Sequence, residues 1–401
     1  MEVLILGTDI NSYYMARCYH ELFHKKVTLI GQTPMAFTDY SNICDVHCYK
    51  NLYDSDLTFR KILIDYASSK SEKILLIATN DHYVTMLINN RRYLSKYYDF
   101  NYPTKSIVQS FLLKEIFYDK YKNKGLDFPQ TLIYDCNSRK NEKCNFKYPV
   151  IIKPSDGVAY HELDFNDQRK VYKVNDEFEY KDSIRKIKES GYKGKLIVQE
   201  FIPGDDTYLY ECVLYLSTKG KAQVASFAKV ALQEHTKTAI GNSTVIVNGY
   251  NNLPGSEEVV KSLKTFLEKI KYTGFAIADI KYDQRDQKYK VLEINPRHGR
   301  GSYYLTPLGH NLVKYFIDDI YYHQEKKFIW LKNKYVLSFV PKIIIKKYVN
   351  DVEFKKEIFK LIKEKKISNP LQYSGDKNLK RKFYLLLRKI NYFKKYKNNH
   401  F

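Results

Sequence analysis

An alternating segment, GFAIADIKYDQRDQKYKVLEINPRHGR, constrains the fold of this chain more than any other. Its pattern predicts a β-hairpin over 275–295 with a polar turn centred near residue 286. Asp279 and Glu293 each lie seven residues from that centre, so they are expected to face each other across the hairpin. Asn295 follows Glu293 by two residues and therefore points to the same face of the sheet.

These three side chains offer two carboxylates and an amide oxygen. Such ligands suit Mg²⁺ held between protein and phosphates, with Mn²⁺ as an alternative. Arg297 and Arg300 follow closely in the sequence, and a guanidinium beside such a metal neutralises charge on a phosphoryl group during transfer. Acidic residues that flank the turn of a surface hairpin are also common, so the hairpin alone does not establish a site.

The N-terminal region alternates between short apolar strands and helical stretches. Strands are predicted at 2–6, 27–30 and 74–78, and the first of them is followed by a helix over 10–23. This alternation predicts a parallel sheet with crossover helices. The loop after the first strand, GTDINS, has a single glycine, which argues against a dinucleotide site of the G-x-G-x-x-G type.

Two lysines and one strand-and-turn segment precede the hairpin along the chain. Lys114 lies in a helix predicted over 105–125, before GLDFPQT, and Lys153 lies in the apolar strand YPVIIKP. The segment LIVQEFIPGDD at 196–206 is predicted to be a strand that runs into a turn, and 257–270 an amphipathic helix. Taken alone, each lysine is typical of a solvated surface position.

In this order, the lysines, the strand-and-turn segment and the hairpin resemble the nucleotide site of the ATP-grasp superfamily of carboxylate–amine ligases. That superfamily combines a lysine, helix, G-x-x-x-P-x-T pattern, a P-hydrophobic-K-P strand, a hinge strand beside adenine and a D…E-x-N metal signature. The resemblance implies an ATP site in which Lys114 and Lys153 contact phosphates, Gln199, Glu200, Phe201 and Ile202 border adenine, and Asp206 holds the ribose hydroxyls.

The same resemblance implies that Asp279, Glu293 and Asn295 ligate one or two Mg²⁺ ions. Arg297 would stabilise the transition state for acyl-phosphate formation, and Arg300 would hold the other carboxylate of an amino acid substrate.

The glycine-rich loop that usually covers the phosphates in this superfamily is largely missing. The chain has only Gly157, in SDGVAYHE, as a candidate backbone contact. Either the loop is short and covers the phosphates less fully, or side chains such as Ser155 take its place.

A narrower resemblance covers residues 1–320. GTDINSYYMARCYH, IVQEFIPGDD, the hairpin and R-x-G-R-x-S-x-Y are similar to the D-aspartate ligases of bacterial cell-wall assembly. This implies that ATP phosphorylates the β-carboxylate of D-aspartate and that the lysine ε-amine of a UDP-MurNAc-pentapeptide attacks the acyl phosphate. A ligase for a different amino acid or surface-polymer acceptor stays an alternative, because the hairpin handles ATP and not the acid. A non-catalytic nucleotide-binding scaffold is another.

The resemblance also implies an α/β fold in which a parallel-sheet domain precedes a two-subdomain, α+β ATP-grasp unit. The expected parts are a pre-ATP-grasp domain over 1–103, ATP-grasp subdomain A over 104–195, subdomain B with the hairpin over 196–325, and a basic helical extension over 326–401.

Several other residues are candidates for substrate contact. Asn11 and Arg17 either contact a substrate or act as a helix cap and a surface charge. Thr79–Asp81 ends a strand at the carboxyl edge of the sheet, where ligands of α/β folds usually bind. The loop at 233–242 either closes over the site as a lid or is a plain connection, and His235 within it is either a general base or a solvated side chain.

The C-terminal part of the chain is strongly basic. The net charge of the whole chain is +22, although AT-rich codons account for much of the excess lysine, and nothing besides charge supports a nucleic-acid partner. Between 377 and 397 there are nine Lys and Arg residues and no acid. The apolar residues there share one face of a helix: Leu379, Phe383, Leu386, Ile390 and Phe393. That face either lies on an anionic membrane surface or packs back onto the body of the protein.

The remaining sequence features bear on location. No apolar run approaches the roughly 20 residues needed to span a bilayer, and the N-terminus lacks the features of a signal peptide. The six cysteines show no CxxC pair, which favours reduced thiols over a metal site. We therefore expect a cytoplasmic protein, at the inner face of the membrane if the basic tail binds lipid. The oligomeric state is left open.

Overall fold

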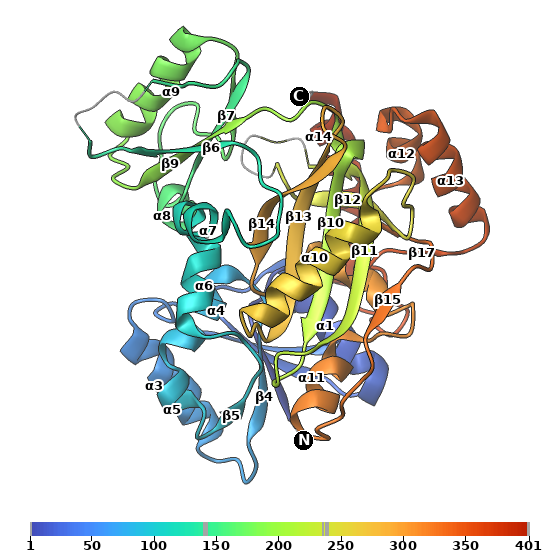
Figure 1. The fold of residues 1–401 in the computed structure, drawn as a ribbon. Coiled ribbons are helices and arrows are strands. Elements are labelled where there is room, and N and C mark those ends of the chain that lie inside the picture. Colours follow the sequence, from blue (N-terminus) through green and yellow to red (C-terminus); the bar gives the residue numbers. More distant parts are fainter. Residues whose placement is uncertain (1, 139–142, 235, 237–239, 399–401) are drawn as a thin grey trace.

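The computed structural model describes residues 2–138, 143–234, 236 and 240–398. Its N-terminal sheet has the strand order β3-β2-β1-β4-β5, and all of these neighbours are parallel. Helices connect the strands, which confirms the crossover pattern predicted from the sequence (Figure 1). The elements are β1 (Val3–Leu6), α1 (Ile10–Phe23), β2 (Val27–Gly31), α2 (Ala36–Asp39), β3 (Cys44–Cys48), α3 (Asp56–Ala67), β4 (Ile74–Ala78), α4 (Asp81–Asn89), α5 (Arg91–Leu94) and β5 (Tyr98–Asp99).

The carboxyl ends of β1 and β4 lie side by side because these two strands are neighbours in the sheet. Asp9 caps α1, since its side chain accepts the backbone N–H groups of Asn11 and Ser12. Gly7 precedes this cap with a φ of 123°, and a Cβ there would lie 2.4 Å from the Thr79 hydroxyl oxygen. Only glycine therefore fits at this crowded edge, which points toward the rest of the molecule.

Two short helices follow where the sequence predicts one. α6 (Lys105–Leu112) and α7 (Lys114–Tyr121) are separated by Leu113, whose backbone is extended. The prediction of a continuous helix over 105–125 was therefore wrong. The break is supported by the Ser155 hydroxyl, which accepts the N–H of Glu115 at 2.9 Å and so satisfies an amide in the first turn of α7. Lys114 thus begins a helix and does not lie inside one.

A small antiparallel sheet with the order β6-β9-β7-β8 comes next. It consists of β6 (Thr131–Asp135), β7 (Val150–Pro154), β8 (Tyr172–Val174) and β9 (Lys195–Glu200), together with the helices α8 (Gly157–His161) and α9 (Glu177–Glu189). β9 pairs within this sheet, so the sheet continues past residue 195, where the sequence predicts the end of the first ATP-grasp subdomain.

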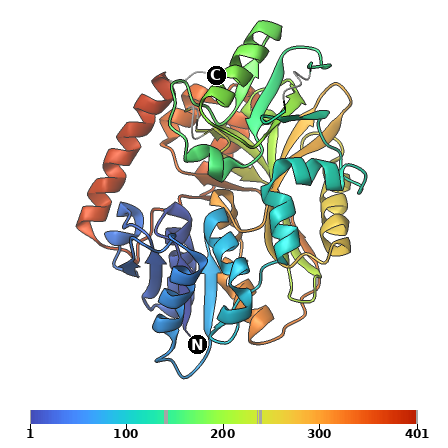
Figure 2. The ribbon, with the colours of Figure 1, turned by 90° about the vertical axis from the view of Figure 1, so that its left-hand side faces the viewer.

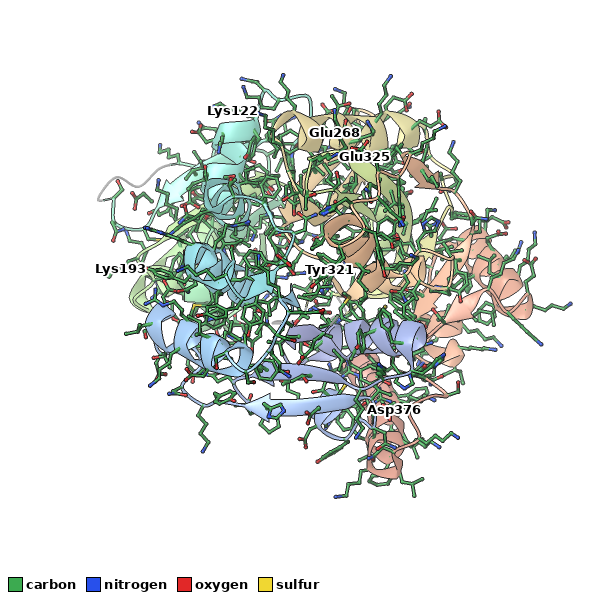
Figure 3. The ribbon with its side chains drawn as sticks, turned by 90° about the horizontal axis from the view of Figure 1, so that it is seen from below. Lys122, Lys193, Glu268, Tyr321, Glu325 and Asp376 are labelled. Atoms are coloured by element: carbon green, nitrogen blue, oxygen red, sulfur yellow. The ribbon has the colours of Figure 1, made fainter. Side chains whose placement is uncertain are left out.

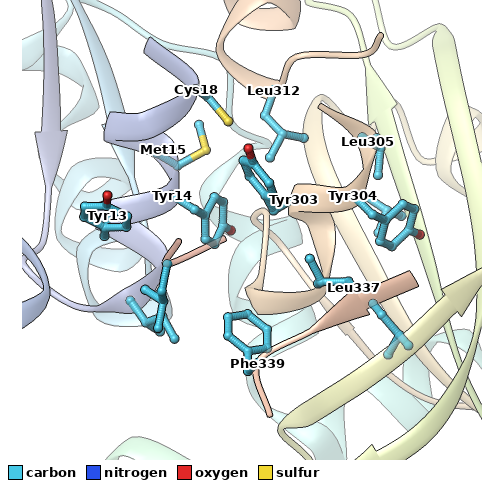
Figure 4. Close-up of a cluster of buried hydrophobic side chains, with 14 of the residues drawn as sticks. Tyr13, Tyr14, Met15, Cys18, Tyr303, Tyr304, Leu305, Leu312, Leu337 and Phe339 are labelled. Carbon is cyan, nitrogen blue, oxygen red and sulfur yellow. The ribbon is translucent and has the colours of Figure 1, made fainter. Parts of the chain in front are cut away.

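The largest sheet has the order β14-β13-β10-β11-β12-β16-β17, with β15 beside β11. One of its faces packs against α6, α7 and α10, and the other packs against α1, α11 and the 3₁₀ turn η2. Figure 4 shows part of the second interface, where Tyr14 and Cys18 of α1 approach Tyr303 and Leu312. The elements are η1 (Asp206–Tyr208), β10 (Leu209–Leu216), β11 (Ala222–Gln233), β12 (Ser243–Asn248), α10 (Ser256–Lys269), β13 (Gly274–Asp283), β14 (Lys288–Asn295), η2 (Arg300–Leu305) and α11 (Leu312–Ile320).

The C-terminal region returns across the molecule to the N-terminal sheet. It contains helices, as predicted, but also strands that extend the large sheet. Its elements are β15 (Ile329–Leu331), β16 (Tyr335–Ser338), α12 (Lys342–Tyr348), α13 (Val352–Lys363), β17 (Ile367–Ser368) and α14 (Leu379–Asn398). Figure 3, seen from below, shows Asp376 where the C-terminal segment meets the N-terminal sheet. Its carboxylate accepts hydrogen bonds from Tyr13 and Ser41 at 3.0 and 2.7 Å. Among the described residues, no helix is long and apolar enough to cross a membrane.

Candidate functional site

The hairpin of β13 and β14 brings its acidic residues together as the sequence predicts. Asp279 pairs directly with Glu293, and Asn295 donates a hydrogen bond from Nδ2 to Asp279 Oδ2 at 3.1 Å. A bulge at Leu292 shifts the register between the turn and this pair. The turn is centred slightly before residue 286, and the extra residue of the bulge restores the pairing of Asp279 with Glu293. The Leu292 carbonyl accepts a hydrogen bond from the Tyr118 hydroxyl.

A third carboxylate extends this row. Glu211 on β10 pairs with Asp279 on the opposite side from Glu293, so acidic side chains occupy equivalent positions on three neighbouring strands. Glu211 is buried, and burial raises its pKa. Burial, followed by the charges of Glu293 and Glu211, raises the pKa of Asp279 well above its usual value. The row is a concentration of negative charge that a cation would relieve.

Glycine makes this row accessible to η2. A Cβ at Gly301 would lie 1.9 Å from Glu211 Oε2, so only glycine lets η2 approach the carboxylate. The described residues contain no group of three His, Cys, Asp or Glu side chains that could hold a metal ion by itself. A cation at Asp279 and Glu293 would therefore need further ligands, such as the Asn295 amide oxygen and phosphate oxygens.

Three lysines face the acidic row: Lys114, Lys153 and Lys170, here called the lysine group. Lys114 Nζ lies 3.2 Å from Glu293 Oε2. Lys153 Nζ lies 3.4 Å from the Tyr118 hydroxyl, and burial and then the charge of Lys114 lower the pKa of Lys153 to about 7. Burial works to raise the pKa of Glu293, but the lysine group outweighs it and holds this pKa well below its usual range.

The structure thus brings together the two predicted lysines and the predicted carboxylates. Lys170 was missed by the sequence reasoning, because it lies in a loop after α8 and outside any pattern. Its Nζ donates to the carbonyl oxygen of Ile240 at 3.2 Å, so it spans from the small sheet to the loop that follows β11. Lysines on one side and carboxylates on the other form an arrangement that can accommodate both the phosphates and the metal of a metal–nucleotide complex.

The predicted hinge lies at the end of β9 and in the loop after it. Gln199 is buried and donates to the Thr131 hydroxyl at 2.7 Å, and Ile202 is also buried. The side chain of Glu200 turns toward the hairpin and forms an ion pair with Arg285 at 2.8 Å, and its backbone N–H donates to the Gln130 carbonyl at 3.1 Å, so its carbonyl is the group left for a nucleotide. Phe201 lies under the cations of Lys173 and Lys281, at 4.3 and 5.3 Å from the ring centroid.

Asp206 is held rigidly at the start of η1. Its two carboxylate oxygens accept hydrogen bonds from the backbone N–H and the side chain of Gln233, at 2.9 and 2.8 Å. Lys281 lies nearby and donates to the Gly204 carbonyl at 2.8 Å, and burial lowers its pKa to about 8. The role of Asp206 toward ribose stays a prediction.

Arg297 joins the hairpin to the N-terminal sheet. Its Nε and Nη2 donate to the two carboxylate oxygens of Asp81 at 2.7 and 3.0 Å, which is a bidentate ion pair. Burial works to lower the pKa of Arg297, but the charge of Asp81 outweighs it and raises this pKa above its usual value. Nη2 also lies 3.5 Å from Asn295 Oδ1. The structure therefore places Asp81, at the end of the predicted Thr79–Asp81 segment, beside Arg297. The proximity of this segment to a substrate stays a prediction.

Arg300 lies on η2 and is already paired. Its Nη1 donates to Glu234 Oε1 at 2.7 Å, and the other oxygen of Glu234 accepts from Lys395 of α14 at 3.1 Å. The charges of Arg300 and Lys395 outweigh burial and hold the pKa of Glu234 below its usual value. Sequence reasoning missed Glu234, because its partners come from segments far apart in the chain.

Other predicted residues lie elsewhere or have different partners. Asn11 does not cap α1; its Nδ2 donates to the Thr79 carbonyl at 3.2 Å. Arg17 is neither a plain surface charge nor a neighbour of the hairpin. It donates to the carbonyls of residues 369, 370 and 372 and lines a separate cavity of about 540 Å³ with Tyr303.

The phosphate-covering loop is as sparse as the sequence suggests. Gly157 is exposed at the start of α8, and a Cβ there would meet nothing within 4 Å. The Ser155 hydroxyl accepts the N–H of Glu115, and the alternative that it contacts phosphates in place of the loop stays a prediction. His235 and much of the predicted lid lie outside the described residues. All six cysteines, each within the described part of the chain, are free thiols.

Comparisons with known proteins agree with this geometry. A family model described as the ATP-grasp domain matches residues 113–300. D-aspartate ligase from Enterococcus faecium (strain Aus0004) is 32% identical over 418 aligned residues, which cover 98% of this chain and 96% of that protein.

Solved structures share the fold at low sequence identity. N5-carboxyaminoimidazole synthetase from Staphylococcus aureus, complexed with ADP, has a TM-score of 0.61 at 12% identity and covers 84% of this chain and 81% of that one. L-amino acid ligase from Bacillus licheniformis has a TM-score of 0.56 at 13% identity and covers 79% of this chain and 73% of that one. These structural similarities support the fold, and the similarity to D-aspartate ligase along 98% of the chain supports the activity. The chain therefore belongs to the ATP-grasp superfamily and is an ATP-dependent carboxylate–amine ligase of the family that includes D-aspartate ligase.

Proposed function

We propose that this enzyme joins the β-carboxylate of D-aspartate to the lysine ε-amine of a UDP-MurNAc-pentapeptide, in the cytoplasm and for cell-wall synthesis. The observation that carries the proposal is the similarity to D-aspartate ligase along 98% of the chain, together with the acidic row and the lysine group that face each other. A non-catalytic scaffold would have no need to keep Asp279, Glu293 and Asn295 in one cluster.

We propose further that the acidic row holds Mg²⁺, with Mn²⁺ as an alternative, and that the lysine group holds the phosphates of ATP. Asp279, Glu293 and Asn295 offer the oxygen ligands that Mg²⁺ prefers. Burial, and then the charges of Glu293 and Glu211, raise the pKa of Asp279, and a bound cation would offset this negative charge. When bound, the cation would neutralise part of the negative charge of the phosphates.

The proposed reaction has two steps. First, a β-carboxylate oxygen of D-aspartate attacks the γ-phosphorus of ATP, and the bond to ADP breaks. An acyl phosphate results, with a leaving group far better than oxide. Second, the neutral amine attacks the acyl carbon, phosphate departs, and the nitrogen loses a proton to give the amide. Arg297, beside Asn295, is the side chain that would face the charge that collects on the transferred phosphoryl group.

The substrates would be recognised by groups near Arg297 and η2. Arg300 is proposed to hold the α-carboxylate of the amino acid. Because Arg300 is already paired with Glu234, it keeps a fixed orientation and presents its remaining N–H groups to a substrate.

Phosphate release from ATP, measured with a panel of D- and L-amino acids, tests this proposal. Each acid is assayed with and without UDP-MurNAc-pentapeptide, and the product is identified by mass spectrometry. D-aspartate together with the acceptor should give the fastest release and a product one aspartyl residue heavier. Faster release with another acid, or with another acceptor, would refute the proposed substrates while keeping the ligase chemistry. If none of the tested pairs of acid and acceptor stimulates phosphate release, the proposed function is refuted.

A further inference from the structure

The C-terminal helix α14 is fixed to the body by polar and aromatic side chains. Arg381 is 2% exposed, donates to the Phe37 carbonyl at 3.2 Å and stacks on the Tyr13 ring at 3.6 Å from its centroid. Near the other end, Tyr396 is equally buried, and its hydroxyl hydrogen-bonds with Thr244. The side of α14 that faces the protein is therefore not its apolar side.

The apolar side of α14 points away from the protein. Six large apolar residues are between 42% and 78% exposed: Leu379, Phe383, Leu386, Leu387, Ile390 and Phe393. We call this set the outer stripe. It spans about 21 Å along the helix at a rise of about 1.5 Å per residue. Figure 2 shows α14 as a long red helix along one side of the molecule. The packing alternative, in which this face covers the body, was therefore wrong.

Cations border the outer stripe without acidic partners. Of the nine Lys and Arg residues at 377–397, Arg381, Arg388 and Lys395 make contacts on the inner side. The others are Lys377, Lys380, Lys382, Lys389, Lys394 and Lys397, and none of them has an ion-pair partner among the residues that the structure describes. A contiguous apolar stripe flanked by lysines is the composition of a helix that lies in a membrane interface.

We infer that the outer stripe of α14 binds an anionic lipid surface. The apolar side chains would enter the boundary between headgroups and acyl chains. The lysines would extend their stems along this boundary and place their ammonium groups among lipid phosphates. The inference is independent of which acid and acceptor the enzyme joins.

Other occupants fit this surface less well. A second copy of the chain would bring two rows of unpaired lysines against each other, which is electrostatically unfavourable. Nucleic acid would engage the lysines but leave the stripe in water, because its outer surface is charged phosphate. A lipid surface satisfies both the apolar and the cationic groups.

The helix would bind while it stays attached to the protein. Lys395 on its inner side pairs with Glu234, which pairs with Arg300, so detachment would break contacts next to the site. Substitutions in the outer stripe touch none of these residues, and the ligase activity of such variants in solution is expected to equal that of the wild type.

Co-sedimentation of the full chain with vesicles tests the inference. Vesicles of phosphatidylcholine alone are compared with vesicles that contain phosphatidylglycerol, at low and high salt. We expect binding to the anionic vesicles only, weakened by salt because screening shortens the range of the attraction. The variant Phe383→Asp/Ile390→Asp should lose at least about tenfold in partitioning, and Lys382→Gln/Lys389→Gln about fivefold for each lysine at low salt.

Matched variants on other helices serve as controls. Phe178→Asp changes a phenylalanine of α9 that is 80% exposed, and Lys261→Gln/Lys269→Gln removes two exposed lysines of α10. Both should bind vesicles as the wild type does. The inference is overturned if the wild type ignores anionic vesicles at low salt, or if the α14 variants bind no worse than their controls. It is also overturned if light scattering shows a dimer that Phe383→Asp/Ile390→Asp dissociates while the wild type fails to bind vesicles.

Discussion

The ion pair between Arg297 and Asp81 leads to a specific prediction about turnover. It connects the hairpin to the start of α4 and fixes the guanidinium that lies beside Asn295. We predict that Asp81→Asn lowers turnover because Arg297 loses its bidentate carboxylate partner and with it a defined orientation. The overall fold should survive, since the asparagine keeps the size of the side chain and one acceptor oxygen.

The size of the expected fall in kcat follows from how exposed the Arg297–Asp81 pair is. The side chains of Arg297 and Asp81 are 17% and 27% exposed. Exposed ion pairs contribute about 0–1 kcal/mol, and loss of one partner from a fully buried pair costs about 3–5 kcal/mol. This partly buried pair falls between them, at about 2 kcal/mol. If the whole of this energy serves to orient Arg297 in the transition state, kcat falls about 30-fold.

The assay is steady-state phosphate release, with KM for ATP measured in parallel. Asp99→Asn is the matched control, because Asp99 in β5 of the N-terminal sheet pairs with Lys73 at 3.2 Å, with the lysine 47% exposed. We expect a large fall in kcat for Asp81→Asn, a nearly unchanged KM for ATP, and no effect in the control. A kcat for Asp81→Asn within twofold of the wild type would refute the idea that Asp81 positions Arg297.

Two further predictions concern the lysine group and α7. Lys153 has a pKa lowered to about 7, so it loses its positive charge as pH rises through 7 in the free enzyme. KM for ATP should therefore rise above pH 7, by at most about tenfold per pH unit, and Lys153→Arg should remove this dependence because arginine stays charged; a wild-type KM that is flat from pH 6 to 8 would contradict this. Ser155→Ala should lower the free energy of unfolding by about 1 kcal/mol, because the N–H of Glu115 loses its acceptor, the hydroxyl of the buried Ser155. Urea denaturation measures this, and an unchanged midpoint would reject the helix-capping role.

The hairpin could be predicted in detail because its geometry is local. The distance of Asp279 and Glu293 from a polar turn determines that they face each other, and period-two alternation determines the face of Asn295. The bulge at Leu292 could not be foreseen, yet it left this pairing intact. The N-terminal strands and α1 were equally accessible, since short apolar runs alternate there with a long helical stretch.

The remaining site residues depend on contacts between distant segments. Glu211 joins the acidic row only because β10 pairs with β13, and nothing in its own neighbourhood in the sequence marks it. Asp81 meets Arg297 across 216 residues of chain. The break at Leu113 was missed because one of the amides that it leaves unpaired, the N–H of Glu115, is satisfied by Ser155, which follows a strand of the next sheet.

The tail shows a different limit of sequence patterns. The spacing from Leu379 to Phe393 identifies which residues share a face, but not whether that face turns inward. Arg381 decides the question, because its guanidinium is buried on Tyr13 and so fixes the opposite side of α14 toward solvent. A basic residue in a lysine-rich helix looks like a surface charge, and the sequence offers no sign that this one anchors the helix.

The Mg²⁺ dependence of nucleotide binding tests the assignment of the hairpin most directly. Isothermal titration of ADP into the wild-type enzyme, with and without Mg²⁺, should show that the cation strengthens binding. Glu293→Gln should retain binding of ADP without Mg²⁺ but lose the strengthening, because it removes a carboxylate that meets Asp279 and Lys114. An equal effect of Mg²⁺ on the wild type and on Glu293→Gln would show that the cation binds elsewhere.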